Sequence, residues 1–123
     1  MNWEFLWVGV GGFLGSISRY GIGVWTTRFW ASSFPLGTFV INLLGCFLIG
    51  LLFGGWIKGN ISDSMSRLLI AGFCGGFTTF SSFSYESLAL IEEGKIGSWA
   101  LYVGGSVFLG MLATWGGITI LRI

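Results

Sequence analysis

Apolar residues dominate four long segments of the chain, and short polar segments separate them. The four apolar segments are residues 3–25, 36–56, 68–91 and 96–120. Each is long enough for a membrane-spanning helix, which needs about 20 mostly apolar residues. The pattern therefore predicts an all-α integral membrane protein with four transmembrane helices, in a single domain that covers residues 1–123.

Composition supports the membrane class and excludes several functions. The chain is 54% hydrophobic and only 9% charged, whereas roughly a quarter of the residues of a soluble domain carry charge. Its net charge of +1 gives no reason to expect a nucleic-acid partner. The chain has no histidine, so the commonest metal ligand and the usual general base near neutral pH are both missing. We therefore expect no enzyme, and we expect Cys46 and Cys74 to be small buried apolar residues.

Residues 72–86, in the third apolar segment, differ from their surroundings. They contain a glycine pair, a threonine pair and phenylalanines at every third position, with hydroxyl side chains between them. Glycines weaken a helix, and threonine hydroxyls can bond back to the backbone and bend it. We expect this helix to break near its middle and to free carbonyl oxygens such as those of Gly75 and Thr78, which are cation ligands. The alternative is a kinked helix that packs through its glycines.

Three further polar residues lie inside or near the ends of the apolar segments. Arg19 is either an interfacial arginine that reaches the lipid headgroups or a buried functional residue. For Asn42 an interhelical hydrogen bond is the favoured interpretation, and a role as a donor to a ligand is the alternative. Glu86 is expected to meet water or an arginine near the end of its helix.

A polar stripe runs along the fourth segment. It is formed by residues spaced four apart, namely Tyr102, Ser106, Gly110 and Thr114, and it is polar except at the glycine. Residues with this spacing share one helix face, and a polar face in a membrane must meet protein or water. Elsewhere, Gly11 and Gly15 in the first segment and Gly50 in the second provide faces on which helices can approach closely.

These side chains together favour a narrow pore for a small anion. Aromatic ring edges carry partial positive charge, and hydroxyl and amide donors can replace the water around an anion. The candidate aromatic residues are Phe77, Phe80 and Phe83. The candidate donors are Asn42, Thr79, Ser81, Ser82, Ser84, Tyr102 and Ser106. The alternative is that the phenylalanines only pack, as they usually do at helical spacing in a membrane.

The distribution of basic residues gives almost no preferred orientation. With the N-terminus inside, the inner side would hold Lys58, Arg67 and Arg122, and the outer side Arg28 and Lys95, with Arg19 as a further candidate. Orientation normally follows an excess of basic residues on the cytoplasmic side. A chain without that excess could insert in both orientations and pair antiparallel with itself.

The motifs resemble those of the Fluc/CrcB family of fluoride channels. The family pattern Gly-Gly-x-Thr-Thr-Phe-Ser-Thr-Phe-Ser is similar to residues 75–84 of this chain, where Ser82 replaces the commoner threonine. The family's Gly-x-x-x-Arg resembles Gly15 to Arg19, and its Pro-x-Gly-Thr-x-x-x-Asn resembles Pro35 to Asn42. The resemblance covers the whole chain in order and length.

This resemblance implies a dual-topology antiparallel homodimer in a bacterial plasma or inner membrane, with two pathways through which cytoplasmic fluoride leaves passively. Phe80 and Phe83 would meet fluoride edge-on, and Asn42 would donate to it. The other implied pathway residues are Thr79, Ser81, Ser82, Tyr102, Ser106 and Thr114. The carbonyls of Gly75 and Thr78 from both subunits would hold one structural sodium ion. Arg19 would have a vestibule or structural role, and Gly110 departs from relatives that carry a hydroxyl there.

Two other function classes remain as alternatives. One is a proton-coupled exporter of small cations that resembles the small multidrug resistance family. Such exporters need a carboxylate inside the first membrane helix, where this chain has only Glu4 at the edge. The other is a non-transporting assembly subunit, which would tolerate apolar replacement of Asn42, Ser81 and Tyr102.

Overall fold

The protein is all-helical over residues 3–122, which are the residues that the computed structural model describes. Its elements are α1 (Glu4–Thr26), α2 (Leu36–Ile57), α3 (Asp63–Ser66), the π-helix η1 (Arg67–Cys74), α4 (Gly75–Phe77), α5 (Phe80–Glu92) and α6 (Ile96–Arg122). The predicted all-α class is therefore confirmed. Residues 1, 2 and 123 of the predicted domain lie outside the described residues, as does the side chain of Arg122 used in the charge comparison.

The third apolar segment differs most from its expected form. Its helical structure begins at Asp63, five residues before the predicted start at residue 68. The reason is a helix cap: the Ser62 side chain accepts a hydrogen bond from Met65 N at 3.2 Å, and Asp63 places a negative charge in the first turn. From there α3, η1, α4 and α5 follow one another up to Glu92, in place of one uniform helix.

Two described helices are long and apolar enough to cross a membrane by length and composition alone, namely α2 and Ile96–Leu121 of α6. α1 is similar in length, but it carries Arg19 and several glycines. The third segment is divided into shorter elements. Large apolar side chains such as Phe13 and Trp115 are exposed on the outside of α1 and α6. An outward-facing apolar surface of this kind suits a protein surrounded by lipid.

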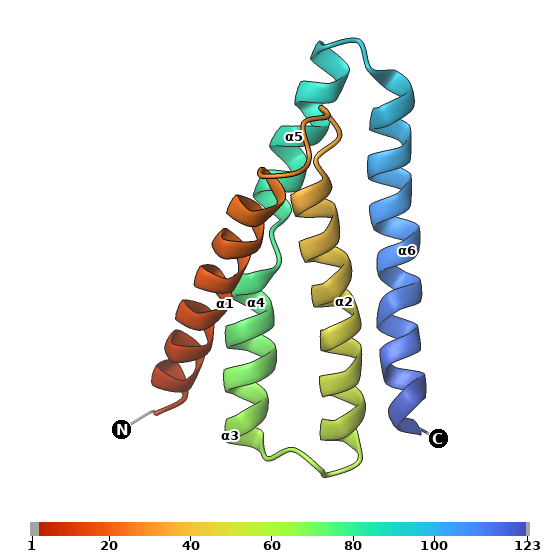
Figure 1. The fold of residues 1–123 in the computed structure, drawn as a ribbon. Coiled ribbons are helices and arrows are strands. Elements are labelled where there is room, and N and C mark those ends of the chain that lie inside the picture. The colour runs from red at the N-terminus through yellow and green to blue at the C-terminus, as the bar shows by residue number, and fades with distance from the viewer. Residues whose placement is uncertain (1–2, 123) are drawn as a thin grey trace.

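Figure 1 shows the helices as two neighbouring pairs. α1 packs beside η1 and α4, and α2 packs along α6. α5 continues beyond α4 to the short turn before α6, and α1 begins at the same end of the bundle at which α6 ends.

Glycines allow both pairs to pack backbone against backbone. A Cβ atom on Gly11 or Gly15 of α1 would collide with the carbonyl oxygen of Leu68 or Phe73. In the other pair, a Cβ atom on Gly50 would collide with the carbonyl oxygen of Thr114. The predicted close-packing faces at these three glycines are therefore confirmed, and they bring the polar positions of neighbouring helices together.

Candidate functional site

Two consecutive threonines separate α4 from α5. Thr78 and Thr79 both have extended backbone conformations, with φ/ψ of −83°/157° and −145°/122°. The Thr78 hydroxyl donates to Cys74 O at 2.9 Å, and the Thr79 hydroxyl accepts from Ser82 N at 3.2 Å. The first bond closes the end of α4 and the second caps the start of α5.

This break removes the helical partners of several carbonyl groups, among them those of Gly75 and Thr78. In a continuous helix Thr79 N would donate to Gly75 O, but here it donates to Asn42 Oδ1 at 2.9 Å. Likewise Ser82 N, which would donate to Thr78 O, donates to the Thr79 hydroxyl. Gly75 is exposed, with open space beside its Cα. The two carbonyls named from the sequence are thus among those whose usual donors bond elsewhere.

Asn42 of α2 makes a second bond to the same residue. Its Nδ2 donates to Thr79 O at 3.0 Å, so the amide pairs with both backbone groups of Thr79. The interhelical hydrogen bond favoured from the sequence is therefore present. A primary amide has two N–H donors, so one N–H of Asn42 stays available to a ligand.

Arg19 lies on the other side of the break. Its Nε donates to Gly76 O at 3.0 Å, and the residue is half-buried. In a continuous helix Phe80 N would supply that bond. The structure shows the Arg19 side chain hydrogen-bonded to the protein backbone. Its positive charge also lies at the C-terminal end of α4, where the helix dipole is negative.

A pocket of about 590 Å³ lies between α2, the broken segment and α6. Seven of the predicted site residues line it: Asn42, Gly75, Thr78, Thr79, Phe80, Phe83 and Ser106. The Phe80 and Phe83 rings have centroids 5.8 Å apart and are tilted by 43°. Phe80 is 80% exposed. Its ring edge is therefore accessible from the open side of the pocket.

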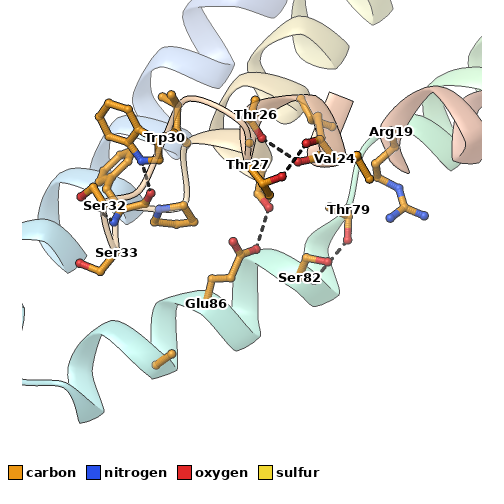
Figure 2. A pocket seen from close by; sticks show the side chains of 18 of the residues that line it. Arg19, Val24, Thr26, Thr27, Trp30, Ser32, Ser33, Thr79, Ser82 and Glu86 are labelled. Carbon is orange, nitrogen blue, oxygen red and sulfur yellow. Dashed lines mark hydrogen bonds between the residues drawn. The ribbon is translucent and has the colours of Figure 1, made fainter. Parts of the chain in front are cut away.

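A second pocket, of about 530 Å³, lies on the α1 side of the break. Figure 2 shows that Arg19, Thr79, Ser82 and Glu86 lie along it. Ser81 lines neither pocket; it is exposed, and its hydroxyl lies 3.4 Å from that of Thr79. The predicted hydroxyl residues of this stretch therefore do not share one pocket: Thr79 lines both pockets, Ser82 lines only the second, and Ser81 lines neither.

Glu86 has a partner that sequence reasoning missed. The Thr38 hydroxyl donates to Glu86 Oε1 at 2.7 Å, so the carboxylate meets a threonine of α2 rather than an arginine. The only signal in the sequence was the position of Thr38 one turn before Asn42. Glu4, expected at the membrane edge, forms an ion pair with Arg67 at 2.9 Å.

The stripe on α6 contains two buried hydroxyl groups without a hydrogen-bond partner among the described residues, namely those of Tyr102 and Ser106. Tyr102 is 0% exposed, and its ring centroid lies 5.2 Å from that of Phe83. An unpaired buried donor costs about 1–3 kcal/mol. These two hydroxyls are therefore suited to a ligand. Thr114 differs, because its hydroxyl lies 3.1 Å from both Cys46 O and Gly110 O.

Within the described residues, no cluster of three or more His, Cys, Asp or Glu side chains could hold a metal ion. Backbone oxygens freed at the break, such as those of Gly75 and Thr78, are of the kind that bind cations.

Comparison with known proteins shows the family to which the chain belongs. The family model described as CrcB-like protein, camphor resistance (CrcB), matches residues 6–118. A protein of Thermus thermophilus named fluoride-specific ion channel FluC is 47% identical over 109 residues, which cover 89% of this chain and 86% of the relative. Proteins with the same name from Acidobacterium capsulatum and Flavobacterium psychrophilum are 42% and 44% identical. Their matches cover 95% and 94% of this chain, and 94% of each relative. The chain therefore belongs to the CrcB family.

Proposed function

We propose that this chain forms a fluoride-selective ion channel through which cytoplasmic fluoride leaves the cell down its electrochemical gradient. The relatives named fluoride-specific ion channel match nearly the whole length of this chain. The observation that carries the proposal is a group of donors without partners near two aromatic rings: the buried Tyr102 and Ser106 hydroxyls lie near the Phe80–Phe83 pair, of which Phe80 is exposed. Among the described residues, no basic side chain lines the pocket at the break, so an anion would be bound weakly enough to leave quickly.

In the proposed pathway, neutral donors replace the water around fluoride. The free N–H of Asn42 and the edges of Phe80 and Phe83 face the anion near the break. The hydroxyls of Thr79, Ser81, Ser82, Tyr102, Ser106 and Thr114 supply further contacts along the way. Arg19 attracts the anion from the second pocket while its Nε holds Gly76 O.

We assign the central cation of the proposed channel to the carbonyls of Gly75 and Thr78. Both oxygens have lost their helical donors, and Gly75 faces open space. A sodium ion accepts oxygen ligands of this kind and supplies a fixed positive charge near the anion pathway. The ion also holds the two copies of the chain together at the exposed Gly75 surface.

The proposed assembly is an antiparallel homodimer in a bacterial plasma or inner membrane. In each copy α1, α2 and α6 cross the membrane, and η1, α4 and α5 act as one interrupted span. The exposed Phe80 ring and the open pocket beside it are the surfaces that a second copy covers. An inside-negative potential of 100 mV contributes about 2.3 kcal/mol to the exit of one negative charge. No other energy source is needed.

The direct test is fluoride efflux from liposomes that contain the purified protein, with chloride as the control anion. We expect fast fluoride efflux and negligible chloride efflux. Phe80→Ile and Phe83→Ile should abolish fluoride efflux without preventing assembly. Phe108→Ile on the exposed surface of α6 is the matched control and should leave efflux unchanged. Efflux that is equally fast for both anions would contradict the proposal.

The same liposomes distinguish the cation-exporter alternative. In that class a carboxylate of the first membrane helix exchanges protons with the substrate, and here Glu4 lies at the start of α1 in an ion pair with Arg67. We therefore expect a proton gradient to drive no uptake of guanidinium.

A further inference from the structure

The polar stripe on α6 is interrupted at Gly110, and one side chain from α2 fills the space beside this glycine. A Cβ atom on Gly110 would meet a single neighbouring atom within 4 Å, Cys46 Sγ at 3.3 Å. Gly110 itself is buried. The thiol therefore lies in contact with the position at which a side chain of residue 110 would begin.

Cys46 also connects the two pockets that border the stripe. It lines the pocket at the break, together with Ser106. It also lines a third pocket, of about 530 Å³, which contains Ser106, Gly110 and Thr114. Along α6 the thiol thus lies between the hydroxyls of Ser106 and Thr114.

The neighbouring hydroxyl groups differ in their availability. The Ser106 hydroxyl is buried, borders both pockets and has no partner among the described residues. The Thr114 hydroxyl has one proton, and the carbonyl oxygens of Cys46 and Gly110 both lie 3.1 Å from it. The next donor beyond Ser106 that is not occupied by the backbone is therefore the S–H group of Cys46.

We propose that the Cys46 thiol is a contact point of the anion pathway and replaces the side-chain donor that Gly110 lacks. The proposal rests on the proposed fluoride-channel function. A thiol is a weak, neutral S–H donor, so it can replace a water molecule of a passing anion without holding the anion tightly. It differs from Cys74, which is 1% exposed in η1 and lines only the pocket at the break.

The test uses methyl methanethiosulfonate, a small neutral thiol reagent. The Cys46 sulfur attacks the reagent, a mixed disulfide with an S–CH₃ group forms, the thiol proton goes to water and methanesulfinate leaves. The added group would occupy the space beside Gly110. We expect treatment to lower fluoride efflux at least tenfold in the parent protein and in Cys74→Ala, and dithiothreitol to restore it. Cys46→Ser and Cys46→Ala should not respond.

Mass spectrometry of the same samples makes each outcome decisive. Three results would each overturn the proposal. Efflux could stay normal although Cys46 is modified, Cys46 could remain unmodified, or the block could disappear in Cys74→Ala. Failure of the untreated parent protein to release fluoride would instead contradict the proposed channel function. The two failures are therefore distinguishable.

The donor role has its own test in untreated protein. Cys46→Ser should keep the efflux rate, because a hydroxyl replaces the thiol. Cys46→Ala should lower the rate about three- to tenfold, as expected for the loss of one hydrogen bond. Adding Gly110→Ser to Cys46→Ala should restore it by placing a hydroxyl in the vacated space. Parent-like efflux from Cys46→Ala would show that the thiol is not a contact point.

Discussion

The side-chain amide of Asn42 forms two hydrogen bonds with the backbone of Thr79: Asn42 Nδ2 donates to Thr79 O at 3.0 Å, and Asn42 Oδ1 accepts from Thr79 N at 2.9 Å. One side chain of α2 thereby satisfies a donor and an acceptor of the extended residue between α4 and α5. Inside a membrane no bulk water can do this, and each unsatisfied backbone group costs several kcal/mol. α2 therefore holds the break in place and presents its remaining N–H to the adjacent pocket.

Replacing Asn42 should affect both folding and conduction. Asn42→Ala leaves Thr79 N unpaired and removes one hydrogen bond from Thr79 O, which as the N-cap carbonyl of α5 also accepts the first bond of that helix. We expect a loss of about 1–3 kcal/mol for the unpaired donor and no fluoride efflux. Asn42→Asp keeps the acceptor for Thr79 N but loses the donor to Thr79 O, so its stability should be intermediate. Thermal unfolding in detergent and liposome efflux measure the two effects. Asn60→Ala, at an exposed asparagine, should match the parent protein. An unchanged melting temperature in Asn42→Ala would contradict this role.

Arg19 combines a hydrogen bond with a charge, and two substitutions separate them. Arg19→Leu removes both, and we expect a loss of about 1.5–3 kcal/mol because the bond to Gly76 O is charge-assisted. Arg19→Gln keeps a donor without the charge. It should recover part of this stability, but its efflux should respond less to ionic strength than the efflux of the parent protein. Melting temperatures and efflux at low and high salt test this division.

Arg28→Gln is the matched control for Arg19, because Arg28 is an exposed cation in the loop after α1. It should change neither stability nor efflux by more than the error of the measurement. If Arg19→Gln kept the same salt response as the parent protein, the charge of Arg19 would have no part in attracting the anion.

The local features of this fold could be predicted from the sequence because they depend on neighbouring residues. Length and apolar composition were enough to locate α1, α2 and α6. Glycine and threonine pairs indicated a weak point in the third segment. The actual break is at Thr78–Thr79 rather than at the glycines. Gly75 and Gly76 keep helical conformation, and the threonine hydroxyls provide the bonds that end one helix and begin the next.

The partners of the polar side chains could not be predicted in the same way. The Arg19–Gly76 bond joins residues 57 positions apart, and the Thr38–Glu86 bond joins residues 48 positions apart. Both depend on how the helices pack, which one sequence does not specify. Likewise the stripe on α6 was visible from its spacing, but nothing in its spacing showed that the Thr114 hydroxyl would lie beside backbone carbonyls.

The contact between α2 and α6 should be sensitive to a single methyl group. A Cβ atom on Gly117 would lie 2.5 Å from Phe47 O and 2.8 Å from Leu51 N, which are backbone atoms that cannot move aside. Gly117→Ala should therefore cost about 1–3 kcal/mol and reduce the yield of folded protein. The neighbouring Gly116 has open space, so Gly116→Ala should be neutral or stabilise the helix by up to about 1 kcal/mol. Equal stability of the two variants would show that the helices can separate slightly without penalty.

The Thr38–Glu86 bond should influence conduction because it fixes a carboxylate at the second pocket. Thr38→Val removes the hydroxyl that donates to the Glu86 carboxylate. The carboxylate thereby loses a hydrogen bond that stabilises its present position by about 1.5–3 kcal/mol. We expect slower fluoride efflux from Thr38→Val and parent-like efflux from Thr38→Ser. Efflux that is unaffected by both changes would mean that the position of Glu86 does not matter for the anion.

The proposed sodium ion is bound by backbone oxygens, so exchanging the ion tests it more directly than mutation. Purification and reconstitution with N-methylglucamine in place of sodium should abolish fluoride efflux, and returning sodium should restore it. The melting temperature should rise with sodium concentration, because a ligand that binds only the folded state adds RT ln(1 + [L]/Kd) to its stability. Potassium at the same ionic strength controls for a general salt effect. Full efflux after complete removal of sodium, or equal stabilisation by both ions, would exclude a specific structural sodium ion at Gly75 and Thr78.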